Sequence, residues 1–135
     1  MNKDCLFCKI INNEIKSYTI YEDDYVKAFL DAFPVSLGHV LIVPKKHYEN
    51  IYDIDEEYLS RIIKIAKKIA LKYKKVFGIN NLQLVHSAGK DGQQEIFHFH
   101  LHLIPRHKDD GINIVQKKSP ELVEKYNEFI NNFKK

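Results

Sequence analysis

The chain has 135 residues, of which 44% are hydrophobic and 29% are charged, and its formal net charge is +3. A chain of this length can bury a real core, so we expect one domain over residues 1–135. The composition is that of an ordinary globular protein, and it shows no nucleic-acid-binding motif. No apolar run approaches the length of a membrane span and no secretory signal is visible, so we expect a cytoplasmic protein that binds neither nucleic acid nor membrane.

Short elements are predicted in the first third of the chain. Residues 5–13 read as a short helix capped by Asp4, and residues 18–21 and 25–30 read as two strands around an acidic turn. A third strand is predicted over residues 39–43, between Gly38 and Pro44, because proline cannot continue a strand ladder.

A long amphipathic helix is predicted from Asp53 or Asp55 to about Phe77, with Gly78 suited to the position after its end. Its apolar stripe consists of Leu59, Ile62, Ile63, Ala66, Ile69, Ala70, Tyr73 and Val76. Residues 82–86 and 97–104 read as two strands joined by a polar turn, and a helix opened by Pro120 is predicted over residues 119–133. The sum is an α+β domain, an antiparallel sheet with one long helix and a C-terminal helix.

Three histidines alternate with large apolar residues in the strand predicted over residues 97–104. Side chains on a strand alternate between its two faces, so His98, His100 and His102 share one face. A half-buried strand normally exposes Thr, Ser, Lys or Glu, and three imidazoles there point to chemistry. Two chemistries fit: metal ligation by a His-x-His pair, or nucleophilic attack on phosphorus by the central imidazole with donors on either side.

Cys5 and Cys8 form a C-x-x-C motif in a chain that looks cytosolic, which favours a metal site or a redox pair over a stable disulfide. Two thiols are half of a tetrahedral zinc site, and His47 and His98 are candidates for the other two ligands. Such a closed site would be structural, clamping the N-terminal helix to the sheet and orienting the strand that carries His100. Two reduced cysteines without a metal are the alternative.

The run from His98 to Ile104 resembles the signature of the histidine triad (HIT) family, in which three histidines alternate with apolar residues. Further motifs in register extend the resemblance over about residues 5–107 and point to the Hint-type branch. They are Cys5–Ile11, Tyr21–Asp24, Ala28–Asp31, Gly38–His47 and Gly92–Glu95. The C-terminal helix and the cysteines are similar to bacterial, zinc-containing members. The resemblance also implies a homodimer, with sheets joined edge to edge and the main helices at the interface.

This resemblance implies a nucleotide hydrolase or transferase that cleaves at the α-phosphate of nucleoside phosphoramidates or related nucleotide esters, without a catalytic cofactor. His100 matches the nucleophile, which would form a covalent nucleotidyl-histidine intermediate; His102 matches a phosphate contact and His39 a histidine near the leaving group, while His98 completes the catalytic triad. Asp31 matches the carboxylate that accepts the ribose hydroxyls of a purine nucleotide such as AMP. Further substrate contacts are implied for Phe29, Ala32, Ser87, Gln93, Gln94 and Glu95, with backbone N–H groups of residues 93–95 on the phosphate.

Two residues depart from the family pattern: Ser87 stands where Asn is common, and Glu95 where Ser is common. Glu95 places a negative charge where a hydroxyl would aid the leaving group, which bears on substrate preference. Three other functions stay open at this point. They are a dinucleoside polyphosphate hydrolase, a non-catalytic purine-nucleotide-binding regulatory module, and a zinc-dependent hydrolase that uses the His-x-His pair.

Overall fold

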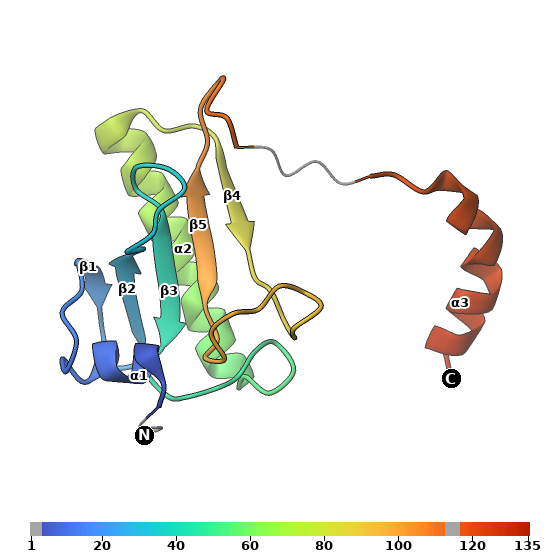
Figure 1. Ribbon diagram of the computed structural model, residues 1–135, viewed down its shortest axis with the longest axis horizontal. Helices are drawn as coiled ribbons and strands as arrows, with labels where there is room; N and C mark the ends of the chain where they lie inside the picture. Colours follow the sequence, from blue (N-terminus) through green and yellow to red (C-terminus); the bar gives the residue numbers. More distant parts are fainter. Residues whose placement is uncertain (1–3, 113–116) are drawn as a thin grey trace.

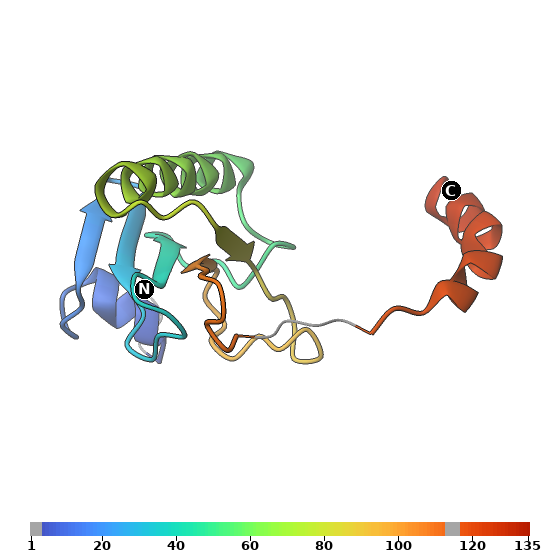
Figure 2. The same ribbon diagram turned by 90° about the horizontal axis from the view of Figure 1, so that it is seen from above.

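The computed structural model describes residues 4–112 and 117–135. One antiparallel sheet forms the centre, with the strand order β1-β2-β3-β5-β4. The strands are β1 (Thr19–Glu22), β2 (Val26–Leu30), β3 (Val40–Pro44), β4 (Leu82–Val85) and β5 (Leu101–Pro105). The long helix α2 (Glu56–Phe77) covers one face of the sheet, and the short helix α1 (Leu6–Ile11) lies on the other (Figures 1 and 2). The predicted α+β architecture is confirmed.

Two apolar clusters hold the layers together, one on each face of the sheet. Ala28 and Ile42 pack in the cluster under α2, whereas their chain neighbours Phe29 and Leu41 pack in the cluster under α1. Because successive side chains of a strand point to opposite faces, β2 and β3 are buried on both sides. The two central strands therefore give a rigid base to the residues that follow them.

The ends of the helices follow local hydrogen bonding. The Asp55 carboxylate accepts from the Glu57 N–H at 2.8 Å, and Gly78 ends α2 with a φ of 66°, both as predicted. At α1 the predicted cap, Asp4, is wrong. The cap is Cys5, whose Sγ accepts from the Cys8 N–H at 3.2 Å, so the first cysteine begins the helix.

The apolar stripe of α2 is narrower than its sequence spacing suggests. Ile62, Ala66 and Ile69 are buried against the sheet, but Ile63 is 49% exposed and Val76 is 57% exposed. These two side chains lie to the side of the face that meets the core. Ile63 also lines an apolar groove between α2 and β4.

The strand predicted over residues 97–104 begins only at Leu101. Most of its side chains face as predicted: Phe99 and Leu103 pack in the cluster under α2, and His98 and His100 contact Phe7 of α1. Phe97, which the alternation placed in the core, is 44% exposed because the segment before residue 98 lies outside the sheet. Residues 98–100 are held by other partners than a strand ladder. The Phe99 N–H, for example, donates to the Tyr48 carbonyl at 2.6 Å.

The C-terminal segment lies apart from the sheet (Figures 1 and 2). It comprises a 3₁₀ turn, η1 (Pro120–Lys125), and the helix α3 (Tyr126–Phe133), in agreement with the predicted helix over residues 119–133. Every residue from 117 to 135 is exposed, including Phe129 and Phe133. Over the described residues, no helix combines the length and the apolar character needed to cross a membrane.

Candidate functional site

A cluster of two cysteines and two histidines joins α1 to the sheet. Cys5 Sγ lies 3.3 Å from His98 Nδ1, and Cys8 Sγ lies 3.4 Å from His47 Nδ1 and 3.5 Å from His98 Nδ1. The two Nδ1 atoms are 3.1 Å apart. All four ligand atoms lie within 4.8 Å of one another, and three of the four residues are buried. The structure thus brings together the four predicted metal ligands.

These distances fit a tetrahedral zinc ion. Zinc–sulfur bonds of about 2.3 Å and zinc–nitrogen bonds of about 2.0 Å place neighbouring ligand atoms about 3.3–3.8 Å apart. Two thiolates and two neutral imidazoles are also a donor set that zinc prefers. Four protein ligands fill a tetrahedral site, so it has no open position for a metal-bound water. The cluster therefore suits a structural ion.

His98 has the tautomer that such a site needs. Its Nε2–H donates to the Pro44 carbonyl at 2.9 Å, which leaves the lone pair on Nδ1 directed at the two sulfurs. Burial is the main cause that lowers the pKa of His98 to about 4, so the ring is neutral at neutral pH. The ring of His98 belongs to this cluster, and its backbone carbonyl serves the next histidine.

His100 is held as a neutral imidazole with one free ring nitrogen. Its Nδ1–H donates to the His98 carbonyl at 2.8 Å, so the lone pair is on Nε2. The side chain is 7% exposed, and burial lowers its pKa. The ring packs against the edge of Phe7, with centroids 5.2 Å apart. A neutral imidazole with a fixed tautomer is poised to act as a nucleophile.

Asp31, His39 and His102 form a group of polar side chains beside the ring of His100. The Val35 N–H donates to His39 Nδ1 at 3.2 Å, so His39 carries its proton on Nε2 and donates it to His102 Nδ1 at 2.9 Å. His102 then carries its own proton on Nε2. An oxygen of Asp31 lies 3.5 Å from His39 Nε2. The ring centroids of His100 and His102 are 5.0 Å apart.

The group of Asp31, His39 and His102 suits hydrogen-bond donation better than metal binding, although its ligand atoms lie close enough together to hold an ion. A metal at His39 would need the lone pair of Nε2, but that atom bears the proton as long as Nδ1 accepts from Val35. Burial is the main cause that lowers the pKa of His39 and that of His102, the latter to about 4. The result is a neutral N–H donor on His102 next to the free nitrogen of His100.

Several groups of residues 93–95 that were predicted to contact the substrate form hydrogen bonds within the protein. The Gln94 side chain is buried and engaged by the protein itself: it accepts from the Gly89 N–H at 2.9 Å and donates to the Glu49 carbonyl at 2.7 Å. The backbone N–H groups of Gln93 and Gln94 donate to carbonyls of residues 90 and 89. These groups shape the turn, and Gln93 and Glu95 are exposed.

Three other predicted substrate contacts lie in different surroundings. Ala32 is exposed and directly follows Asp31, whose second oxygen accepts from the Phe33 N–H at 2.8 Å. Ser87 is half-buried just beyond β4. Phe29 is 3% exposed and its ring packs on Phe7, so its role is in the core under α1.

Sequence reasoning missed Phe7 as part of the site. Its ring contacts the rings of His98 and His100 edge-on, with centroid distances of 5.9 and 5.2 Å, and it is 2% exposed. Phe7, Ile10 and Ile11 recur in the sequence at helical spacing, which is typical of a buried helix face. That spacing could not show that histidines far along the chain form the other side of that contact.

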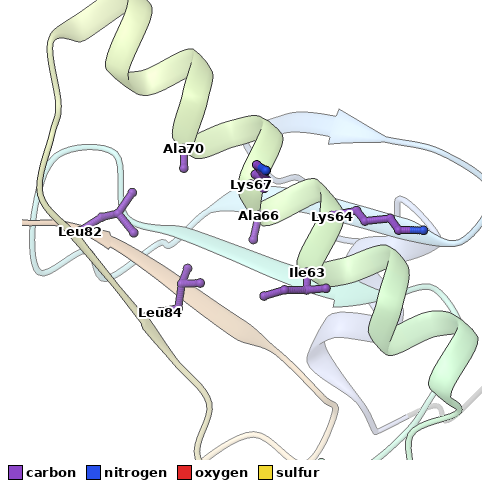
Figure 3. Close-up of a pocket in the computed structure, with 7 residues that line it drawn as sticks. All are labelled: Ile63, Lys64, Ala66, Lys67, Ala70, Leu82 and Leu84. Carbon is purple, nitrogen blue, oxygen red and sulfur yellow. The ribbon is translucent and has the colours of Figure 1, made fainter.

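An apolar groove lies on the opposite side of the sheet, between α2 and the edge strand β4. Figure 3 shows Ile63, Ala66 and Ala70 of α2 facing Leu82 and Leu84 of β4. Its volume is about 390 Å³, and Lys64 and Lys67 complete the lining. None of the catalytic candidates lines this groove.

Comparisons with known proteins agree on one family. The family model described as HIT domain matches residues 12–109. A HIT-like protein of Borreliella burgdorferi is 41% identical over 128 residues, covering 93% of this chain and 92% of its own. The yeast (Saccharomyces cerevisiae) protein named adenosine 5′-monophosphoramidase HNT1 is 40% identical over 111 residues, covering 82% of this chain and 68% of its own.

Solved structures show the same fold. A HIT family protein from Bacillus anthracis matches with a TM-score of 0.84 and 36% identity over 98% of each chain. A zinc-bound histidine triad family protein from Mycobacterium smegmatis matches with a TM-score of 0.77 and 28% identity, over 87% of this chain and 86% of that one.

Proposed function

The chain belongs to the HIT family, and from this premise we propose that it is a nucleotide hydrolase or transferase that cleaves at the α-phosphate of nucleoside phosphoramidates or related nucleotide esters. The observation that carries the proposal is the hydrogen bond from His100 Nδ1–H to the His98 carbonyl. It fixes the tautomer in which Nε2 can attack phosphorus. The relationship to a protein named adenosine 5′-monophosphoramidase supports this substrate class and a purine nucleotide such as AMP as ligand.

The reaction follows from the protonation states of three histidines. His100 Nε2 attacks the α-phosphorus, a P–N bond forms to the ring, and the bond from phosphorus to the leaving amine breaks. His102 Nε2–H donates a hydrogen bond to the phosphoryl group, and the hydrogen bond from His39 Nε2–H to His102 Nδ1 holds His102 in that tautomer. The leaving nitrogen takes up a proton from solvent as its bond to phosphorus breaks, so it departs as the neutral amine. Water then attacks phosphorus and breaks its bond to His100 Nε2, which releases the nucleoside monophosphate, returns one proton to solvent and restores the neutral imidazole.

Asp31 is proposed to bind the ribose. Its carboxylate accepts from the Phe33 N–H and keeps further lone pairs, enough to accept from a hydroxyl pair. Ala32 and Ser87 are proposed to lie near the nucleoside. Cys5, Cys8, His47 and His98 are proposed to hold a zinc ion whose only role is structural, since it ties α1 to the chain that carries His100. The zinc-bound relative supports this assignment.

The zinc-dependent alternative finds no support in the geometry. A His-x-His site needs two lone pairs directed at one ion, but His98 directs its lone pair at the cysteines. His102 is no better partner for His100, because its Nδ1 accepts from His39 and its Nε2 carries the proton. A dinucleoside polyphosphate hydrolase uses the same chemistry with a different leaving group. Turnover measurements distinguish a phosphoramidate hydrolase, a dinucleoside polyphosphate hydrolase and a non-catalytic binding module.

The test measures hydrolysis of adenosine phosphoramidate and of a dinucleoside polyphosphate by the wild type, by His100→Ala and by His107→Ala, with bound zinc and AMP affinity determined for each. His107 lies in an exposed loop and serves as the matched control. We expect His100→Ala to lose at least about a thousandfold in kcat while it retains zinc and AMP binding, and His107→Ala to behave like the wild type. Equal activity of His100→Ala would refute covalent catalysis. AMP binding without turnover of phosphoramidate or dinucleoside polyphosphate would favour the binding module.

We also propose a homodimer formed through β4 and α2. β4 is an edge strand of the sheet, and beside it Ile63 and Leu84 are 49% and 43% exposed. A second copy would continue the sheet at this edge and cover the apolar groove of Figure 3. We expect Leu84→Glu to halve the mass in sedimentation experiments, whereas Ile20→Glu on β1, the opposite edge, leaves the mass unchanged. A dimer that survives Leu84→Glu would refute this interface.

A further inference from the structure

His86 links two segments of the site although it takes no part in the proposed reaction. Its Nδ1–H donates to the His100 backbone carbonyl at 3.1 Å. Its Nε2 accepts from the Ile51 N–H at 3.1 Å. The ring is stacked on Phe99, with centroids 4.4 Å apart and an interplanar angle of 24°. Because one nitrogen faces a carbonyl and the other faces an N–H, only the neutral Nδ1–H tautomer satisfies both contacts.

The hydrogen bond from His86 to the His100 carbonyl lies where the pairing of β4 with β5 ends. β4 ends at Val85, which pairs with His102, and His100 lies just outside β5. The peptide of His100 therefore lies where the ladder between β4 and β5 ends. There the side chain of His86 supplies a hydrogen bond to the His100 carbonyl. The ring of His100 is fixed by the His98 carbonyl and its main chain by His86, so both the side chain and the main chain of His100 are held.

We propose that His86 is a positioning residue for the nucleophile, acting through the hydrogen bond from Nδ1–H to the His100 carbonyl. The inference rests on the proposed function. Without this bond, the peptide plane after His100 can turn, and Nε2 moves away from its line of attack. Small displacements of a reacting atom cost large factors in rate, on the order of a hundredfold for 1 Å. Binding of the nucleotide does not depend on that alignment.

Three variants separate the contacts of His86. His86→Asn keeps an amide N–H close to the position of Nδ1, and can still donate to the His100 carbonyl. His86→Gln places its amide near the position of Nε2, so it can accept from Ile51 but loses the bond to His100. His86→Phe keeps a flat ring on Phe99 and loses both hydrogen bonds.

We expect His86→Gln and His86→Phe to lower kcat by about tenfold to a hundredfold with KM within about threefold of the wild type, and His86→Asn to stay within about threefold in both. Equal losses in the Asn and Gln variants would overturn the inference, because the retained donor would then be without effect. A wild-type kcat in His86→Phe would overturn it as well. If His86→Phe does not fold, the Asn and Gln pair decides alone.

A second measurement is independent of turnover. The ¹³C shift of the His100 carbonyl reports its hydrogen bond, and it should change in the Gln and Phe variants but not in the Asn variant. If the wild type hydrolyses no nucleotide substrate, the proposed function fails, while this shift still tests the contact. A shift that is unchanged in all three variants would show that His86 does not hold the carbonyl.

Discussion

Replacing Phe7 should weaken the fold and the site together. Its ring is 2% exposed and packs on Phe29, His98 and His100, with centroid distances of 5.6, 5.9 and 5.2 Å. Truncation of a buried Phe to Ala costs about 3–5 kcal/mol, and each lost ring pair accounts for about 0.5–1.5 kcal/mol of such a loss. We therefore expect Phe7→Ala to lower the free energy of unfolding by about 4 kcal/mol.

Urea unfolding measures this effect. With a slope of about 2 kcal/mol per molar urea, the midpoint should fall by about 2 M. Phe7→Leu, which keeps apolar volume but no ring edge, should lose less stability and still lower kcat several-fold, because the ring of His100 loses its flat neighbour. Phe129→Ala on the exposed helix α3 is the control, expected to change stability by less than about 0.5 kcal/mol. A loss below about 1 kcal/mol in Phe7→Ala would refute the argument that this ring supports the histidines.

Two further predictions concern pH and metal. Burial lowers the pKa of His102 to about 4 and also lowers the pKa of His100, so the acid limb of kcat/KM should lie below pH 6.5. The cationic form of His102 is disfavoured by folding, so the free energy of unfolding should fall as the pH drops from about 6.5 towards 4. An acid limb near pH 6.5 would contradict the first statement, and a free energy of unfolding that stays constant over this range would contradict the second. Cys8→Ser should lose bound zinc, determined by metal analysis, and melt at a lower temperature, with lower kcat because the His98 carbonyl that orients His100 is less well held. Full zinc content in that variant would rule out Cys8 as a ligand.

For the histidine segment, the sequence predicted the side of the sheet to which most side chains point better than it predicted where the strand begins. Alternation placed His98 and His100 opposite Phe99 and Leu103, and this is what the structure shows. The start of the strand was wrong because hydrogen bonds from other segments, such as that to the Tyr48 carbonyl, replace the ladder over residues 98–100. Such tertiary contacts leave no trace in a local hydrophobic pattern.

Spacing alone also could not assemble the clusters. Cys5 and His98 are 93 residues apart, and they were joined in the prediction because two thiols need two further zinc ligands, with support from the resemblance to zinc-containing family members. The tautomers of His39, His98 and His100 depend on single carbonyl and N–H partners, which only the structure identifies. By contrast, the cap of α2 at Asp55 and its end at Gly78 follow from side chains next to each other in the chain, and both were predicted.

His98 has a consequence for redesigning or diversifying this protein. Its ring belongs to the cysteine cluster and its carbonyl orients His100, the proposed nucleophile, so one residue belongs to both sites. Exchange of Cys5 and Cys8 for apolar side chains would therefore alter the catalytic geometry unless the new packing held residue 98 in the same place. Variants that have lost the cysteines and keep activity should carry compensating changes around His98, in particular at Phe7 and Pro44. The two sites have to change together.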